Sequence, residues 1–151
     1  MTYGLLESEL TGNEEVFNKT QPVGETFKYK ISNIIDQGSE PICSTCSTSV
    51  FLDWNYDKEF DYYSLFRKAG GTSAGLSYTD LLKYIRKKGL IREYALVHSL
   101  VPLKTAIRVN GPCLGAIMVR DSNRPDFWNG SRNIGLHGVA IIGWNKEGFI
   151  I

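Results

Sequence analysis

Two segments of the sequence contain the residue types that a thiol-dependent reaction requires. Residues 36–46 read DQGSEPICSTC and include Cys43, and residues 136–144 read LHGVAIIGW and include His137. A cysteine thiol is mostly protonated at neutral pH, and the positive end of a helix or a nearby imidazolium promotes the reactive thiolate. Cys43 stands near the expected start of a helix, and His137 lies in an expected strand. The first influence is expected at Cys43 from its position, and His137 can supply the second if its strand packs against the helix start.

An acyl-transfer reaction also needs hydrogen-bond donors directed at the oxyanion that develops on the substrate. Gln37 lies six residues before Cys43, across a turn that contains Gly38. Its side-chain amide and the backbone N–H of Cys43 are the donors that we expect. Each signal is weak alone, because a single buried cysteine is more often a small core residue.

The segment around Cys43 is predicted to open the central buried helix. Ser39 is a preferred capping residue, and Glu40 and Pro41 suit a first turn. Apolar residues then recur near helical spacing to Trp54 and form one stripe, made of Cys43, Cys46, Val50, Phe51 and Trp54.

Three further helices are expected. The first covers 59–68, with Phe60, Tyr63 and Phe66 on one side, and ends at Gly70-Gly71. The next starts at Ser77, which forms a capping-box-like pair with Asp80, and stops at Gly89. Its buried side is predicted to hold Leu81, Leu82 and Ile85. The last helix opens at Pro102, directs Leu103 and Ile107 inward and ends at Asn110-Gly111.

Strands are expected mainly in the last third of the chain. Residues 113–119 and 137–144 form apolar runs, separated by a loop over 121–135, and a hairpin at 144–148 leads into a final strand. Residues 27–31 alternate apolar residues with Lys28 and Lys30, which indicates a short strand or extended arm without a chemical role. Helices followed by an antiparallel sheet predict an α+β fold, with an N-terminal arm over 1–35 and one globular domain over 36–151.

Composition narrows the classes of function. The chain has 151 residues, three cysteines and a formal net charge of +1, which gives no electrostatic case for binding nucleic acid or a membrane. The first ten residues do not resemble a signal peptide, and no apolar run approaches a membrane span. An odd number of cysteines favours free thiols in a reducing compartment. We therefore expect a cytoplasmic or virion-associated protein.

Residues 36–46 and 136–144 point to one protein family when they are considered together. Asp36-Gln37-Gly38 with Cys43 at the sixth position after Gln37, followed by a helix, resembles the active-site segment of papain-like cysteine peptidases. Residues 136–144 resemble that family's histidine strand, and Gly148-Phe149-Ile150-Ile151 resembles the strand after it. Gly70-Gly71-Thr72-Ser73 resembles the segment after the family's glycine pair. The resemblance covers 36–151 in the family's order.

The resemblance implies a papain-like fold and hydrolysis of peptide or isopeptide bonds in a peptide or protein substrate. It assigns Cys43 as nucleophile, His137 as general acid/base and Gln37 as oxyanion donor. It also places Gly71 and Gly138 beside the substrate. It implies no cofactor and no metal.

The chain departs from the family in three respects. The Cys-Gly-Ser-Cys-Trp signature is absent, and a shift of register would make Cys46 the nucleophile. The separation of Cys43 from His137 is shorter than the family's roughly 130–150 residues, as in compact microbial or viral relatives. The sequence stops before the family's Asn-Ser-Trp-Gly segment, so we expect a C-terminally truncated sheet without the usual orienting Asn. Asn133 or Asn145 can be considered as substitutes.

Two other readings compete with a peptidase. A Cys43-x-x-Cys46 pair at a helix start occurs in thiol–disulfide exchange enzymes, but the βαβ context of those enzymes is missing. A zinc site from Cys43, Cys46, His98 and His137 has motif spacing only for the two cysteines. The stronger rival is an inert papain-like domain that binds a protein partner, for example in a viral particle, through the strand edge at Phe149 to Ile151.

Overall fold

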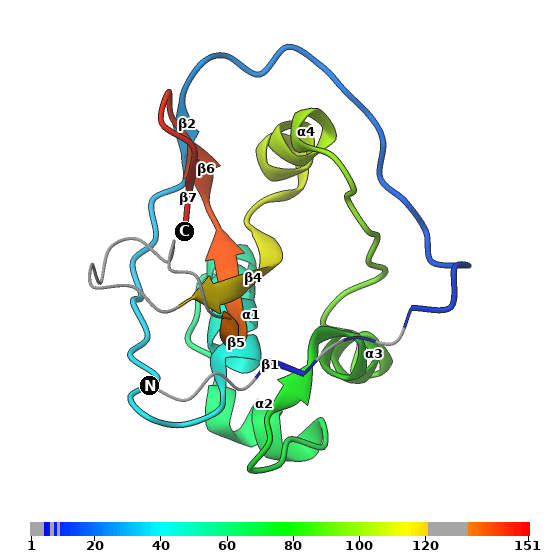
Figure 1. Ribbon diagram of the computed structural model, residues 1–151, viewed down its shortest axis with the longest axis vertical. Helices are drawn as coiled ribbons and strands as arrows, with labels where there is room; N and C mark the ends of the chain where they lie inside the picture. The colour runs from blue at the N-terminus through cyan, green and yellow to red at the C-terminus, as the bar shows by residue number, and fades with distance from the viewer. Residues whose placement is uncertain (1–4, 7, 9, 121–132) are drawn as a thin grey trace.

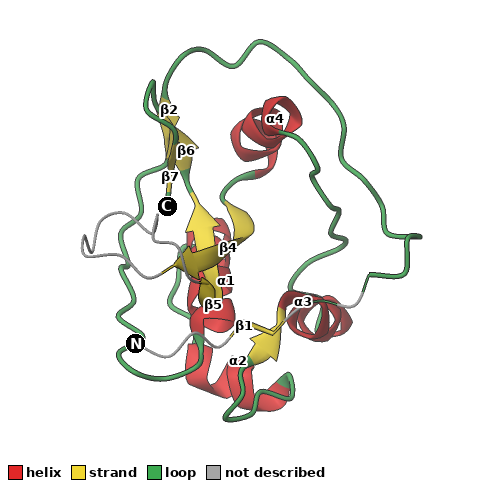
Figure 2. Cartoon of the chain, in the orientation of Figure 1, coloured by secondary structure: helices red, strands yellow, loops and turns green. Residues whose placement is uncertain are grey.

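The computed structural model describes residues 5–6, 8, 10–120 and 133–151 and has an α+β architecture (Figures 1 and 2). Its described helices are α1 (Cys43–Tyr56), α2 (Tyr62–Lys68), α3 (Tyr78–Lys87) and α4 (Leu100–Asn110). Its described strands are β1 (Leu5–Leu6), β2 (Phe27–Lys28), β3 (Leu76–Ser77), β4 (Cys113–Arg120), β5 (Asn133–Ile141), β6 (Gly143–Trp144) and β7 (Phe149–Ile150). The expected α+β class is confirmed.

The strands form two antiparallel sheets and one short parallel pair. β4 and β5 make a long antiparallel ladder in which His137 lies opposite Ile117. β2, β6 and β7 form the second sheet in that order, so β2 and β7 are its outer strands among the described residues. β1 pairs in parallel with β3. The expected hairpin into the final strand is confirmed, since Gly143 lies opposite Ile150.

Helix α1 starts three residues later than the sequence predicts. Residues 37–40 form a turn instead, in which Glu40 N–H donates to the Gln37 carbonyl at 3.2 Å and Gly38 has φ +58°. Pro41 also disfavours helical backbone at the residue before it. The N-cap residue is therefore Ile42, and no side chain caps the helix. The prediction that Ser39 caps this helix was wrong.

The buried part of α1 differs from the expected apolar stripe. All seven residues from Cys43 to Ser49 are buried, whereas Trp54 is 36% exposed. Small Ser, Thr and Cys side chains let neighbouring elements approach α1 from several directions. The main apolar core lies between α1, α2 and α3 and contains Ile42, Cys46, Leu52, Leu65, Phe66, Leu76, Leu81 and Ile85.

Helix α2 is shorter than predicted, because Asp61 caps it by accepting from Ser64 N–H at 2.9 Å. Tyr63 is 43% exposed, so its expected place on the inner side was wrong, and Leu65 takes that place beside Phe66. Residues 69–71 end the helix, with Gly71 N–H donating to the Phe66 carbonyl at 2.8 Å.

Helices α3 and α4 follow the sequence signals more closely. Ser77 Oγ accepts from Asp80 N–H at 3.1 Å and donates to its carboxylate at 2.8 Å, which confirms the capping pair. Leu81 and Ile85 are buried, and Gly89 follows the helix with φ +73°. Helix α4 begins at Leu100 rather than Pro102, because a proline is tolerated inside the first turn.

The strand that contains His137 begins earlier and ends earlier than predicted. β5 starts at Asn133, so His137 lies in its interior, and Ile142 separates β5 from β6. The predicted loop over 121–135 therefore ends by 132, and residues 121–132 of it lie outside the described residues. Because of the break at Ile142, β5 pairs with β4, whereas β6 pairs with β2 and β7.

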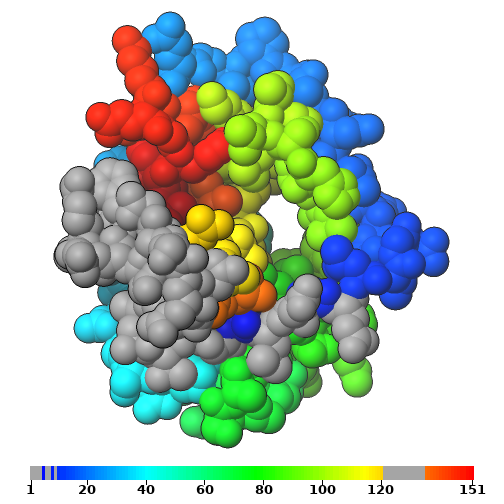
Figure 3. Space-filling model, viewed as in Figure 1, coloured from blue at the N-terminus to red at the C-terminus, as the bar shows by residue number. Residues whose placement is uncertain are grey.

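The N-terminal arm wraps around the periphery of the molecule. After β1 it passes the segment that leads into α4, where Phe17 N–H donates to the Leu96 carbonyl at 2.8 Å (Figure 3). It then enters the second sheet as β2, with Phe27 opposite Trp144. Among the described residues, no helix has the length and apolarity needed to cross a membrane.

Candidate functional site

The β4–β5 hairpin lies against the first turn of α1, and a glycine allows this contact. Gly138 is buried next to His137 in β5. A Cβ at Gly138 would lie 2.7 Å from the Tyr78 hydroxyl oxygen and 3.4 Å from the carbonyl carbon of Cys43. The residue after His137 is therefore in close backbone contact with Cys43, although the two segments are far apart in sequence.

A buried hydrogen-bond network fixes this junction. The Tyr78 hydroxyl lies 2.6 Å from Ser47 Oγ, and it is within 3.2 Å of the Gly115 carbonyl and 3.4 Å of the Val139 carbonyl. Ser47 Oγ in turn donates to the Cys43 carbonyl at 2.7 Å. Burial raises the pKa of Tyr78 above its ordinary value, so the hydroxyl keeps its proton and remains a donor. The network links α1, α3 and both strands of the hairpin.

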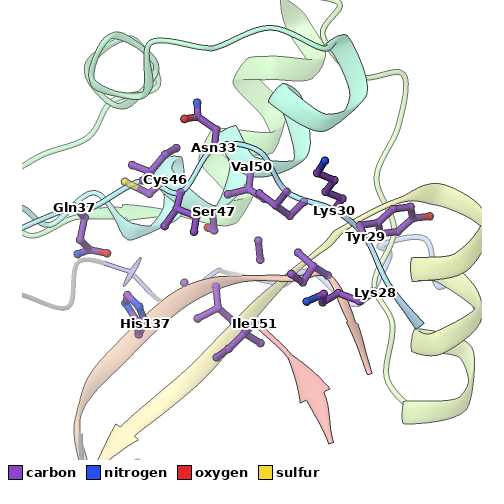
Figure 4. Close-up of a pocket in the computed structure, with 17 residues that line it drawn as sticks. Lys28, Tyr29, Lys30, Asn33, Gln37, Cys46, Ser47, Val50, His137 and Ile151 are labelled. Atoms are coloured by element: carbon purple, nitrogen blue, oxygen red, sulfur yellow. The ribbon is translucent and has the colours of Figure 1, made fainter. Parts of the chain in front are cut away.

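A cavity of about 570 Å³ lies between the hairpin, α1 and the segment after β2 (Figure 4). This volume is within the usual range for ligand sites in proteins. Gln37 and His137 lie at one end, and Lys28 and Tyr29 lie at the other. The wall between them is mainly apolar; it contains Ile31, Ile34, Ile35, Val50, Val139, Ala140, Ile142 and Ile151.

Gln37 reaches the cavity from the turn that precedes α1. Its Nε2 donates to the Glu40 carbonyl at 3.0 Å, which holds the side chain over the turn. Asp36 steadies the same turn by accepting from Gly38 N–H at 2.8 Å. Since the first N–H groups of a helix have no intrahelical acceptor, the start of α1 offers further donors close to Gln37.

His137 lines the cavity from β5 and is partly buried. Desolvation lowers the pKa of its imidazole below the ordinary value of 6.5. At neutral pH the ring is therefore uncharged, which is the form that can accept a proton from a thiol. It does not provide the preformed imidazolium that the sequence argument considered as an activator of Cys43.

The cysteines differ in their environments. Cys43 is the first residue of α1 and is 1% exposed. Cys46 is 8% exposed and lines the cavity. Burial, and then the neighbouring Cys43 and Asp36, raise the pKa of Cys46 to about 12. Burial also raises the pKa of Cys113 to about 11. All three thiols are free.

The other residues singled out in the sequence lie in different places. Gly71 ends α2, where a Cβ would collide with the Phe66 ring, and it is not among the described residues that line the cavity. Gly138 does line it. Asn145 Oδ1 accepts from the N–H groups of Glu147 and Gly148, so its carboxamide serves the β6–β7 turn. The side chain of Asn133 is outside the described residues.

The zinc alternative gains no geometric support. His98 is exposed on the segment before α4. In the described part of the chain, no three His, Cys, Asp or Glu side chains cluster in a way that could hold a metal ion.

The sequence analysis did not predict that residues of the N-terminal arm line the cavity. Lys28 and Lys30 line it, although 27–31 was assigned no chemical role. Their spacing of two was the available signal, since residues two apart in an extended chain face the same side. Tyr78 was also missed, and nothing in its local sequence distinguishes it from other tyrosines.

Comparison with known proteins identifies no relative. No protein-family model matches the chain. No curated protein and no solved structure gives a significant match.

Proposed function

We propose that this protein is a papain-like cysteine peptidase that hydrolyses peptide or isopeptide bonds. Cys43 is the nucleophile, His137 the general acid/base and Gln37 an oxyanion donor. The observation that carries the proposal is the position of Gln37 and His137 at the same end of one cavity, beside the first turn of the helix that begins with Cys43. The sequence analysis singled out Gln37 by its spacing to Cys43 and His137 by its place in an apolar strand, and the family resemblance assigned their roles.

The proposed reaction begins with an uncharged imidazole. His137 takes the proton of the Cys43 thiol while sulfur bonds to the substrate's carbonyl carbon, and the carbonyl electrons move to oxygen. The Gln37 amide and the N–H groups at the start of α1 stabilise this oxyanion. The tetrahedral species then collapses, the C–N bond breaks, and the imidazolium gives its proton to the departing amine. Water, deprotonated by His137, finally cleaves the thioester and restores the thiol.

Cys46 lines the cavity, whereas Cys43 is not among the described residues that line it; Cys43 is assigned as the nucleophile for two other reasons. A pKa of about 12 leaves Cys46 almost entirely protonated at neutral pH. Cys43 is the first residue of α1 and lies at the six-residue spacing from Gln37 that the family resemblance gives to the nucleophile.

One observation favours the second candidate, an inert papain-like domain that binds a protein partner. Cys43 is only 1% exposed, so a substrate carbonyl has no direct path to its sulfur in this conformation. β7, an outer strand of its sheet among the described residues, would then provide the backbone edge for the partner.

Alkylation separates the two candidates. Iodoacetamide at pH 6–7, followed by peptide mass mapping, should modify Cys43 much faster than Cys46 or Cys113. His137→Ala should slow the reaction at Cys43, whereas His98→Ala, which removes an exposed histidine, should not. Cys43→Ser should abolish hydrolysis of a fluorogenic peptide library. Equally slow labelling of all three thiols, with no hydrolysis, would reject the peptidase in favour of the inert domain.

A further inference from the structure

The charged side chains that line the cavity in the described part of the chain are of one sign. They are Lys28 and Lys30, and both are exposed enough to meet a ligand. Lys28 is in β2, opposite Gly143, and Lys30 follows two residues later, just beyond the strand; both line the cavity. Two like charges along one wall favour an anionic group in the cavity.

The Asp53 carboxylate, near Lys30, is already engaged by other groups. Asp53 lies beside Lys30 in a smaller adjoining hollow. Its Oδ2 accepts from Asn33 at 3.0 Å, and its Oδ1 accepts from Phe60 N–H at 2.9 Å. Asp53 therefore partly offsets Lys30 and leaves Lys28, which is farther along the cavity, as the stronger anchor.

The apolar wall suits a chain rather than a small anion. Ile34 lines the cavity and is 90% exposed, and Val139 and Ile142 continue the apolar surface on the opposite side. A peptide with an apolar side chain would cover this surface. Figure 4 shows the lysine end and the Gln37–His137 end on opposite sides of the cavity, with Val50 and Ile151 between them, so one extended segment can contact both.

We propose that the cavity selects peptides in which an apolar residue near the cleaved bond is followed, toward the Lys28 end, by Asp or Glu. This substrate preference rests on the proposed peptidase function, since it places the cleaved bond at Gln37 and His137. Exposed ion pairs contribute modestly, so the expected preference for Glu over Gln is about fivefold for the lysine pair. It should weaken as salt screens the charges.

Binding and cleavage must be measured separately. The probe is a synthetic octapeptide library built from Ala, Leu, Phe, Ser, Gln, Glu and Lys. The Cys43→Ala protein is immobilised, and the bound peptides are identified by mass spectrometry in low salt and in 0.5 M NaCl. The unmodified protein is given the same library, and its cleavage products are sequenced.

Three paired variants make the test specific. Lys28→Gln/Lys30→Gln should abolish the preference for Glu, and Lys28→Arg/Lys30→Arg should keep it. Lys83→Gln/Lys87→Gln changes the net charge equally but alters exposed residues of α3, and it should behave as the unmodified protein does. Circular dichroism checks that each variant is folded.

The outcomes distinguish the preference from the peptidase activity. Equal binding of Glu and Gln peptides, a preference that survives Lys28→Gln/Lys30→Gln, or no binding at all would overturn the preference. Loss of the preference in the α3 control would also overturn it, because bulk charge would then be the cause. Cleavage without a preference would leave the peptidase proposal standing, whereas selective binding without cleavage would reject the peptidase and support the acidic-peptide site.

Discussion

Replacing Gly138 with alanine tests whether close contact between hairpin and helix holds the site together. The added Cβ would lie 2.7 Å from the Tyr78 hydroxyl oxygen, which is shorter than any ordinary contact. Overpacking of this kind costs about 1–3 kcal/mol. If Tyr78 moves away, its hydrogen bond to Ser47 is lost as well, which adds about 1 kcal/mol. We therefore expect Gly138→Ala to lower the free energy of unfolding by about 2–4 kcal/mol.

The double variant with Tyr78→Phe separates this contact from general damage. Tyr78→Phe alone should lower the free energy of unfolding by about 1–2 kcal/mol through the lost hydrogen bonds. It also removes the oxygen that blocks the new Cβ, so the next neighbour is the ring carbon Cζ at 3.1 Å, a tight contact that a small shift can relieve. The two changes should therefore combine to less than their sum by about 1 kcal/mol or more.

Urea unfolding followed by far-UV circular dichroism measures the free energy of unfolding of the unmodified protein, the two single variants and the double variant. The midpoint and the slope are fitted separately for each protein. Tyr63→Phe is the matched control, because Tyr63 is 43% exposed and its change should stay within about 0.5 kcal/mol. Additive effects of Gly138→Ala and Tyr78→Phe, or an unchanged stability of Gly138→Ala, would refute the proposed contact.

Two further changes test the surroundings of the site. Burial lowers the pKa of His137 below 6.5, so the unfolded chain binds a proton at this residue more readily than the folded chain does. The contribution of His137 to the free energy of unfolding is therefore present above about pH 6.5. It is lost as the pH falls toward the pKa of the folded state. His137→Gln should remove that part of the pH dependence of urea unfolding, and an NMR titration midpoint at or above 6.5 for His137 would contradict the reasoning. Ser77→Ala should lower the free energy of unfolding by about 1 kcal/mol, because the α3 cap is lost. Ser73→Ala, which changes an exposed loop serine, is the control in the same urea assay. Equal stability of the two variants would argue against the cap.

Features set by neighbouring residues could be predicted from the sequence. The capping pair of Ser77 and Asp80, the stop at Gly89 and the β6–β7 hairpin each depend on a few adjacent side chains. The start of α1 could not be predicted in the same way, because a helix cap and a turn compete for the same residues. Ser39 favours a cap, but the Asp36 carboxylate and the left-handed Gly38 stabilise a turn instead.

The site depends on contacts between distant segments, and the sequence pattern alone could not provide these. Gln37 was named from its spacing to Cys43 and His137 from its strand and the family resemblance, and both line the cavity. The near-complete burial of Cys43 and the two lysines at the opposite end follow from how the hairpin and the arm pack on α1, which no local periodicity encodes.

The seven small buried residues that open α1 have a consequence for the order of folding. Ser, Thr and Cys are weak helix formers, and no side chain caps this end. Several of the hydroxyls bond to carbonyls of the preceding turn; for example, Thr48 donates to the Ser44 carbonyl at 2.8 Å. The first two turns therefore have little helical stability of their own and depend on the β4–β5 hairpin, which comes from much later in the chain. Bringing the hairpin to α1 closes a long loop of chain, and the entropic cost of this closure comes before the contacts between the two elements can stabilise it. The start of α1, and with it the environment of Cys43, therefore becomes ordered only in the cooperative step that docks the hairpin.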